Sequence, residues 1–338
     1  MRAATIPRPG VVEVRDFPVP AAREDGDVVV RMDYASVCGS DVHSLYDGFH
    51  NEALLGRPGY PGHEGVGTVV ESRSPAFPEG ARVLTVPVGS AGGCFAAYQL
   101  LSDRYLVALP DDGDPARLLM AQQYGTTLYA MRQIWPEPGH TGIETGVAAV
   151  IGAGSAGLFF VQQLRRRGFA QIVVSDLDEH RLDVARRLGA TTCVTAPADS
   201  VVAAVHDLSA GLGADLVIEA AGYDACRADA VAAVRIGGTI GLFGFPEKLG
   251  PVPFPQNDAF RKLARLQWSG GAQAEPGLVA FRDALRDIHT GSVEVDHCLG
   301  ARYDLEQVPE AMAAARDLGR GAIKLTIEIS PGSEGIRG

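Results

Sequence analysis

Residues 1–100 contain short runs of alternating apolar and polar residues, separated by glycine and proline. The runs at 27–37 and 65–71 have the two-residue period of β-strands that bury one face. From about residue 117 the apolar residues recur at helical spacing, and residues 136–146 are rich in glycine and proline, as in a loop or linker. The pattern predicts an irregular β-rich unit followed by a helix.

The pattern changes at residue 147. Residues 147–194 have the pattern of an apolar strand, a glycine turn, a helix, a second strand, a second helix and a third strand. Further buried strands, separated by helical stretches, are predicted at 214–222, 237–244 and 265–271. Nearly continuous apolar strands that alternate with helices are typical of a parallel doubly wound sheet that is covered on both faces.

The last part of the chain has amphipathic patterns. Residues 277–291 and 305–319 place apolar residues at helical spacing, and residues 322–329 form a final apolar strand. The tail at 330–338 is expected to fray. The order of elements therefore predicts an α/β protein with two units.

Composition and charge narrow the class of protein. The chain has 338 residues, of which 46% are apolar, so two domains with large cores are expected. Its net charge of -11 repels phosphate backbones and anionic lipids, which argues against a nucleic-acid or membrane partner. We recognise neither an apolar signal segment nor a run of about 18 apolar residues that would span a bilayer. Five scattered cysteines without C-x-x-C spacing suit a reducing, cytoplasmic location.

The glycine turn after the first apolar strand is GAGSAG, with Gly152, Gly154 and Gly157. In this setting the first glycine permits a tight turn, the second lets a pyrophosphate approach the backbone, and the third lets helix and strand pack closely. Asp176 ends the next strand, where a carboxylate accepts hydrogen bonds from the ribose hydroxyls of NAD and repels the 2′-phosphate of NADP. Arg181 follows closely enough to flank the adenosine ribose. These features predict an NAD site.

The segments CGSDVH and GHEGVGTVVE contain side chains suited to zinc. Cys38 and His63 are common types of zinc ligand, and Glu64 could ligate directly or lie behind the metal. A metal with an open coordination position lowers the pKa of an alcohol and so favours hydride transfer to nicotinamide. The spacing alone does not bring the two segments together, and a buried cysteine with an unrelated loop histidine fits the same residues.

Taken together, these motifs resemble the zinc-dependent medium-chain dehydrogenase/reductase superfamily, which includes alcohol, sorbitol, threonine and archaeal glucose dehydrogenases. VCGSDVHSLYDG is similar to the polyol dehydrogenase form of the first metal block, and GHEGVGTVVE is similar to the second. GAGSAG, GADLVIEAAG and AIKLTIEI resemble the cofactor and C-terminal blocks. The resemblance implies a GroES-like, β-rich catalytic domain of residues 1–145 and 272–338, and a Rossmann NAD-binding domain of residues 146–271.

The resemblance also implies roles around the metal. Cys38 and His63 would be ligands of one catalytic zinc, with Glu64 beside them. Asp41 would accept a hydrogen bond from the far nitrogen of His63 and fix its tautomer.

For catalysis, the resemblance implies that Ser40 contacts the substrate hydroxyl. His43 would pass the proton to solvent through the nicotinamide ribose. Thr126 would contact the nicotinamide region of the cofactor.

The chain departs from the family pattern in two places. Many members have a lobe of four cysteines around a structural zinc, but residues 90–101 contain only Cys94, so no structural zinc is expected. The remaining ligand position, usually Cys or Glu, falls in LLMAQQYGTTLYA, where aligning Ala130 places Gln122 with Gln123 as its neighbour. An amide oxygen can ligate zinc but is neutral; the alternative is that this position has decayed.

The sequence thus predicts a zinc- and NAD-dependent dehydrogenase of a secondary alcohol, such as a polyol, sugar or cyclitol. A metal-free enone or quinone reductase of the same superfamily is the alternative enzyme, although such members typically lack the Cys and GHE blocks. A non-catalytic NAD-binding protein is a third hypothesis, but such a protein has no use for Ser40 and His43. A homodimer through the edge strands between residues 237 and 271 is also expected.

Overall fold

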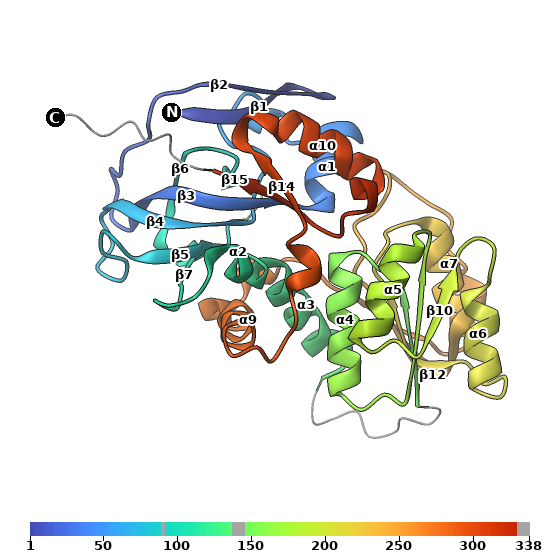
Figure 1. The fold of residues 1–338 in the computed structure, drawn as a ribbon. Coiled ribbons are helices and arrows are strands. Elements are labelled where there is room, and N and C mark those ends of the chain that lie inside the picture. Colours follow the sequence, from blue (N-terminus) through green and yellow to red (C-terminus); the bar gives the residue numbers. More distant parts are fainter. Residues whose placement is uncertain (89–91, 137–145, 330–338) are drawn as a thin grey trace. The chain divides into compact units, whose positions relative to one another are not determined.

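The structure of this chain is a computed structural model that describes residues 1–88, 92–136 and 146–329 (Figure 1). Most of the linker predicted at 136–146 and all of the tail predicted at 330–338 lie outside the described residues. Within the described residues, no helix is both long enough and apolar enough to cross a bilayer.

The chain divides into two compact units. The first unit comprises Met1–Gly125 and Gly271–Gly338, and the second comprises Thr126–Gly270. The first division falls inside the helix α3 (Ala121–Ile134), whereas the sequence placed it after residue 145. One continuous helix therefore contributes residues to both units.

The first unit is built on a mixed sheet. Its strands, in spatial order, are β14 (Ala301–Asp304), β15 (Leu325–Glu328), β3 (Asp27–Val37), β4 (Gly65–Ser72), β5 (Arg82–Thr85) and β7 (Leu106–Ala108). β6 (Tyr98–Ser102) pairs antiparallel with β3 as well. β15 pairs antiparallel with β3 and parallel with β14, so the last strand of the chain lies inside the sheet, next to the longest N-terminal strand (Figure 1).

Alternation along these strands supplies the core of the first unit, because successive side chains of a strand point to opposite faces. In β3, Val28, Val30 and Met32 are fully buried and pack in one cluster with Leu325 and Ile327 of β15. A hairpin of β1 (Arg2–Arg8) and β2 (Val11–Asp16) adds Ala4 and Ile6 to the same cluster.

Helices complete the first unit. They are α1 (Gly39–Tyr46), α2 (Pro115–Leu118), the start of α3, α9 (Val279–His289) and α10 (Val308–Arg316). All but α1, which was not predicted, lie close to the positions expected from the sequence. At the start of α2, the Asp114 carboxylate accepts a hydrogen bond from the Ala116 N–H at 3.0 Å, and Pro115 occupies the first helical position. α10 ends at Arg316, earlier than the sequence pattern suggested.

The second unit is a parallel sheet. Its strands, in spatial order, are β10 (Thr192–Thr195), β9 (Gln171–Asp176), β8 (Val147–Ile151), β11 (Ala214–Glu219), β12 (Val234–Leu242) and β13 (Arg265–Trp268). All neighbouring pairs run parallel. The strand order reverses between β8 and β11, which is the switch point where open α/β sheets bind ligands beyond the carboxyl ends of their strands.

The helices of the second unit lie between these strands in the sequence, as the alternation predicted. They are α4 (Ser155–Arg166), α5 (Glu179–Leu188), α6 (Val201–Leu208), α7 (Asp224–Ala233) and α8 (Gln256–Arg261). The prediction that 265–271 is a buried strand was wrong. In β13, Leu266 is 40% exposed and Trp268 is 58% exposed, because this strand has a sheet neighbour on one side only.

A glycine-containing loop of the first unit leads directly into His63. Gly59 lies in the left-handed region at φ +76°, and its carbonyl oxygen accepts hydrogen bonds from the N–H groups of Gly62 and Phe95. A Cβ added to Gly59 would lie 2.0 Å from the carbonyl oxygen of Gly93. The loop therefore packs backbone against backbone, and this packing fixes the segment that carries His63.

We expect Gly59→Ala to destabilise the protein more than Gly56→Ala, by about 2 kcal/mol or more. Both glycines have positive φ, +76° and +79°, so each alanine variant bears a left-handed strain of about 1–2 kcal/mol. Only Gly59 adds a backbone clash, since nothing lies within 4 Å of a Cβ at Gly56. Urea unfolding of both variants measures the difference, and equal losses would show that the loop can open without cost.

Candidate metal centre and dinucleotide turn

Cys38, His63 and Glu64 come together at one point of the first unit. One ligand atom from each, the Cys38 sulfur, a His63 ring nitrogen and a Glu64 carboxylate oxygen, lie within 4.8 Å of one another. Cys38 precedes α1 directly after β3, and His63 and Glu64 immediately precede β4. The pairing of β3 with β4 thus brings two distant segments of the sequence to the same place.

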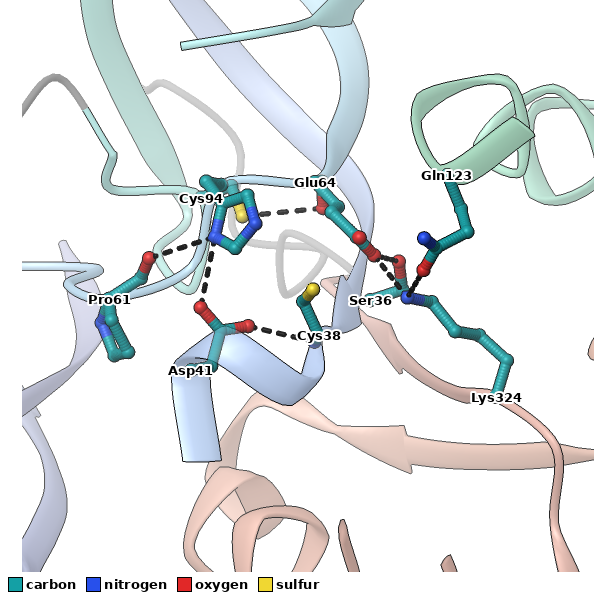
Figure 2. Close-up of polar contacts among 9 residues, drawn as sticks. Ser36, Cys38, Asp41, Pro61, Glu64, Cys94, Gln123 and Lys324 are labelled. Carbon is teal, nitrogen blue, oxygen red and sulfur yellow. Dashed lines mark hydrogen bonds and ion pairs between the residues drawn. The ribbon is translucent and has the colours of Figure 1, made fainter. Parts of the chain in front are cut away.

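Asp41, in the first turn of α1, contacts both of these segments. Its Oδ2 accepts a hydrogen bond from the Cys38 N–H at 2.9 Å, and its Oδ1 lies 3.0 Å from His63 Nδ1. The Pro61 carbonyl oxygen is also 3.4 Å from this nitrogen (Figure 2). Because both of these neighbours can only accept, Nδ1 carries the hydrogen, and Nε2 of His63 keeps its lone pair for a ligand.

The Asp41 carboxylate also controls the charge of His63. Burial alone would lower the pKa of the imidazole, but the Asp41 charge and hydrogen bond, with a smaller contribution from Cys38, raise this pKa well above its usual value. Without a cation the ring therefore binds a proton on Nε2. A metal that binds there displaces this proton, as expected when a cation and a proton compete for one ligand atom.

Glu64 is held by a buried cation from the other end of the chain. Lys324 Nζ lies 2.5 Å from Glu64 Oε2 and donates a second hydrogen bond to Gln123 Oε1 at 3.1 Å. The Ser36 hydroxyl donates to the same Glu64 oxygen. Figure 2 shows Glu64 linked to both Ser36 and Lys324, and Gln123 linked to Lys324. All four side chains are buried.

The buried pair is charged. Burial alone would raise the pKa of Glu64, but the charges of Lys324 and His63 and the hydrogen bonds of Lys324 and Ser36 lower it below its usual value. Burial alone would lower the pKa of Lys324, and the Glu64 charge raises it instead. Glu64 is therefore a carboxylate whose charge Lys324 already compensates.

Lys324 was not predicted from the sequence. The sequence did contain a signal for it. Lys324 is the single charged residue in AIKLTI, a run that otherwise has the composition of a buried strand. Ser36, one residue inside β3, gave no comparable signal. Cys94 also lies nearby, where its thiol donates to the Glu64 carbonyl oxygen at 3.3 Å (Figure 2).

The two glutamines of α3 have different surroundings. Gln123 turns its amide oxygen to Lys324, while Gln122 is 2% exposed and precedes it in the helix. Adjacent helical residues point about 100° apart, so the two side chains leave α3 in different directions. The amide oxygen of Gln123 is engaged by Lys324, and Gln122 remains the predicted metal ligand.

Ser40 and His43 lie three residues apart in α1 and are both partly buried. That spacing puts them on one face of the helix. The Nδ1 atom of His43 is 2.8 Å from an Asp47 carboxylate oxygen.

In the second unit, the glycine turn between β8 and α4 has the geometry that a dinucleotide needs. Gly152 has φ +101°, and a Cβ on Gly157 would lie 1.9 Å from the Gly152 carbonyl oxygen. The fold itself therefore requires these two glycines. Gly154 is the N-cap residue of α4, and a Cβ there would meet nothing within 4 Å, so the space beside it is open to a phosphate.

Asp176 ends β9 next to this turn. Its Oδ2 accepts a hydrogen bond from the Ala153 N–H at 2.6 Å, and its Oδ1 accepts one from the Asp178 N–H at 3.0 Å. The carboxylate thus lies beside the glycine turn. Arg181 follows in the first turn of α5, and Thr126 lies in the part of α3 that belongs to the second unit.

Comparison with known proteins identifies the class. The family described as "Alcohol dehydrogenase GroES-like domain" matches residues 24–111, which include Cys38, His63 and Glu64. The family described as "Zinc-binding dehydrogenase" matches residues 156–282, which begin within α4. The fold and the two matches define a dehydrogenase with a GroES-like domain and a Rossmann-type sheet.

Relatives along the full length give the family. The chain is 30% identical to the "Probable zinc-binding alcohol dehydrogenase" of Mycobacterium tuberculosis, over 100% of this chain and 91% of that relative. It is 25% identical to the sorbitol dehydrogenase of Bacillus subtilis, over 97% of each. The chain therefore belongs to the zinc-dependent alcohol dehydrogenase family of the medium-chain dehydrogenase/reductase superfamily.

A solved structure shows the same fold. It is a Sinorhizobium meliloti protein bound to NADP, which is 24% identical with a TM-score of 0.82. The match covers 97% of this chain and 99% of that one. The predicted fold class, a GroES-like domain with a Rossmann domain, is confirmed.

We expect Lys324→Met to lower the free energy of unfolding by about 3–5 kcal/mol, because it leaves Glu64 buried without its cation. The double variant Lys324→Met/Glu64→Gln should recover much of this loss, since it leaves no unpaired charge. Chemical denaturation of the two variants and of Glu64→Gln, with and without chelator, measures the coupling.

Lys248→Met serves as the matched control. Lys248 is 2.9 Å from an Asp224 carboxylate oxygen, but its side chain is 55% exposed, so its removal should leave unfolding unchanged within error. If Lys324→Met behaved like Lys248→Met, the buried ion pair would have no part in holding Glu64.

Proposed function

We propose that this chain is a zinc- and NAD-dependent dehydrogenase that oxidises secondary alcohols of the polyol, sugar or cyclitol class. The observation that carries the proposal is the arrangement of Cys38 and His63, both positioned by the buried carboxylate of Asp41. A sulfur and an imidazole nitrogen fixed in this way match the ligand types of zinc. The membership of the alcohol dehydrogenase family supports the same chemistry.

One zinc per chain would be held by Cys38 and His63, with Gln122 as the remaining protein ligand and Glu64 close enough to ligate or to lie behind the ion. When bound, zinc lowers the pKa of an alcohol hydroxyl. Cysteine thiolate is the one anionic ligand in the set of Cys38, His63 and Gln122, which leaves a net charge of about +1. Glu64 changes this sum little, because Lys324 compensates its charge.

Ser40 and His43 would remove the proton of the substrate hydroxyl. Ser40 accepts the proton from the alcohol as it passes its own onward, and His43 releases the proton to water. Their placement three residues apart on α1, a helix whose N-terminus is tied to Cys38, supports this role. Asp41 takes part as the group that holds Cys38 and His63 in place.

The nicotinamide cofactor would lie at the glycine turn of the second unit, with Gly152, Gly154 and Gly157 at the pyrophosphate. Asp176 supports NAD over NADP, because a 2′-phosphate would lie beside its carboxylate. Arg181 would flank the adenosine ribose. Thr126 would contact the nicotinamide region.

The substrate class follows from the relatives and the motif rather than from a pocket. The sorbitol dehydrogenase relative and the polyol-type segment CGSDVH support a polyol or sugar over a simple alcohol. A homodimer in the cytoplasm is proposed as the working form. The exposed edge strand β13, with apolar Leu266 and Trp268, supports an interface between two copies there.

Zinc content tests the central proposal. Protein purified without chelator should contain about one zinc per chain by elemental analysis and should form NADH with at least one member of a panel of polyols, sugars and cyclitols. Cys38→Ser should lose both zinc and activity. Gln122→Ala should lose zinc faster on dialysis than Gln123→Ala, its neighbour on α3.

Two results would contradict this proposal. A metal-free protein that gains no activity on addition of zinc would exclude the zinc site. Faster zinc loss from Gln123→Ala than from Gln122→Ala would show that Gln123, and not Gln122, is the third ligand.

We expect Asp176→Ser to reduce the preference for NAD over NADP, measured as the ratio of the two kcat/KM values, by roughly tenfold, equivalent to about 1.4 kcal/mol. The reason is the loss of repulsion between the carboxylate and the 2′-phosphate. Asp178→Ser is the control, because Asp178 caps α5 and serine caps a helix well. An unchanged ratio in Asp176→Ser, or a wild-type preference for NADP, would refute the assignment.

A further inference from the structure

The geometry points to Asp47 as a positioning residue that fixes the imidazole of His43 in a single tautomer. His43 Nδ1 lies 2.8 Å from Asp47 Oδ2. A carboxylate accepts hydrogen bonds and donates none, so Nδ1 carries the hydrogen and the lone pair lies on Nε2. This inference rests on the proposed function, because the tautomer matters for catalysis only if His43 moves a proton.

The backbone of α1 holds Asp47 in place. Asp47 caps the C-terminus of this helix, and its N–H donates to the His43 carbonyl oxygen at 3.0 Å. The N–H of Phe49 donates to the same oxygen at 3.3 Å. Asp47 and Phe49 are therefore both bonded through their N–H groups to the His43 carbonyl oxygen. These bonds limit how far the Asp47 carboxylate can move from the imidazole ring.

The stability of α1 does not explain an aspartate at this place. The C-terminus of a helix carries partial negative charge, so a carboxylate there is unfavourable for the helix, and Lys, Arg or Asn would suit it better. Gly48, which follows with φ +82°, already supplies the left-handed residue that ends a helix. The contact with His43 is the compensating interaction that the structure shows for the Asp47 side chain.

An aromatic ring restricts His43 from another side. The rings of His43 and Phe49 meet edge to face, with centroids 5.7 Å apart and planes at 65°. The His43 side chain is 22% exposed and that of Asp47 is 37% exposed. The imidazole is thus constrained by a carboxylate and a ring but still reaches water, which a group that releases protons requires.

Charged groups lie near His43 on two helices. On α1 itself, Asp47 is a charged partner of His43. From α10, which packs against α1, Arg316 stacks on the Tyr46 ring at 4.5 Å. The cation of Arg316 is therefore directed to the residue before Asp47.

The arrangement suits the last step of the proposed proton path. The Nε2 lone pair accepts the proton that Ser40 passes on, while the hydrogen on Nδ1 stays bonded to Asp47. The positive ring is then stabilised by the carboxylate, and Nε2 returns its proton to water, so that His43 ends neutral with the same tautomer. Without Asp47, a fraction of the rings would carry the hydrogen on Nε2 and could not accept.

Nitrogen-15 NMR of labelled protein tests the tautomer directly. With eight histidines in the chain, the His43 signals are assigned from their loss in His43→Gln. Wild-type protein should show His43 with hydrogen on Nδ1. Asp47→Ala should show a mixture of both tautomers. Asp47→Asn should keep the wild-type tautomer, because an amide oxygen still accepts the Nδ1 hydrogen.

Kinetics separates positioning from folding. Asp47→Ala should lower kcat by roughly tenfold with KM unchanged, within the range of a positioned acid–base group. Asp47→Asn should lose less, because it removes the charge and keeps the hydrogen bond. In a His43→Gln background, Asp47→Ala should have no further effect. Glu52→Ala is the control. It removes an acidic side chain from the turn that follows α1, and its kcat should match that of the wild type.

The outcomes distinguish this inference from the function on which it rests. If His43 keeps a single Nδ1-protonated tautomer in Asp47→Ala, or if Asp47→Ala slows the His43→Gln enzyme as much as the wild type, Asp47 does not position His43 and the inference fails while the dehydrogenase stands. If no alcohol is oxidised but the tautomer shifts as expected, the positioning is supported and the proposed function fails. Should Asp47→Ala not fold, Asp47→Leu takes its place, because a leucine side chain accepts no hydrogen bond, and a single Nδ1-protonated tautomer of His43 in that variant would overturn the inference.

Discussion

The candidate metal centre depends on one buried carboxylate. Asp41 accepts from the backbone N–H of Cys38 with one oxygen and bonds the imidazole of His63 with the other. It thereby fixes the separation of a sulfur that follows β3 and a ring nitrogen that precedes β4. A site assembled in advance loses less conformational freedom when its ion binds. The same contact selects which ring nitrogen faces the ion.

Two buried carboxylates within one small region would be unfavourable without compensation. The structure pairs each with a different cation. Asp41 has the His63 imidazole, whose Nε2 proton must leave when a metal binds, and Glu64 has Lys324, which stays. The negative charge of Asp41 therefore remains available to support a metal-bound imidazole, whereas Glu64 is balanced whether or not a metal is present. Glu64 therefore attracts a cation less strongly than its closeness to Cys38 and His63 would suggest, because Lys324 already balances its charge.

Sequence patterns predicted the elements that rest on local rules. The glycine turn was identifiable because Gly152 and Gly157 occupy positions where a side chain cannot fit, and Cys38 with His63 because their motifs are specific. Lys324 was not predicted, because its partner Glu64 is remote in sequence: the pattern shows a lysine in an apolar run but not the carboxylate with which it pairs. β13 was predicted as buried because it continues the alternation of strands and helices, but it lies at the edge of the sheet with one neighbouring strand and is exposed. The division between the two units inside α3 was not predicted, because a continuous helix shows no break in its pattern of apolar residues.

The place of β15 in the sheet has a consequence for how the protein is made. Synthesis proceeds from the N-terminus, so β3, Glu64 and the loop that carries His63 leave the ribosome long before Lys324 does. Until then β3 lacks one of its sheet neighbours and Glu64 lacks its cation. The second unit, encoded by one uninterrupted stretch, has no such dependence and can fold while the rest of the chain is still being translated. The first unit therefore matures last, although its sequence begins first, and until β15 is made the unpaired edge of β3 is open to wrong association.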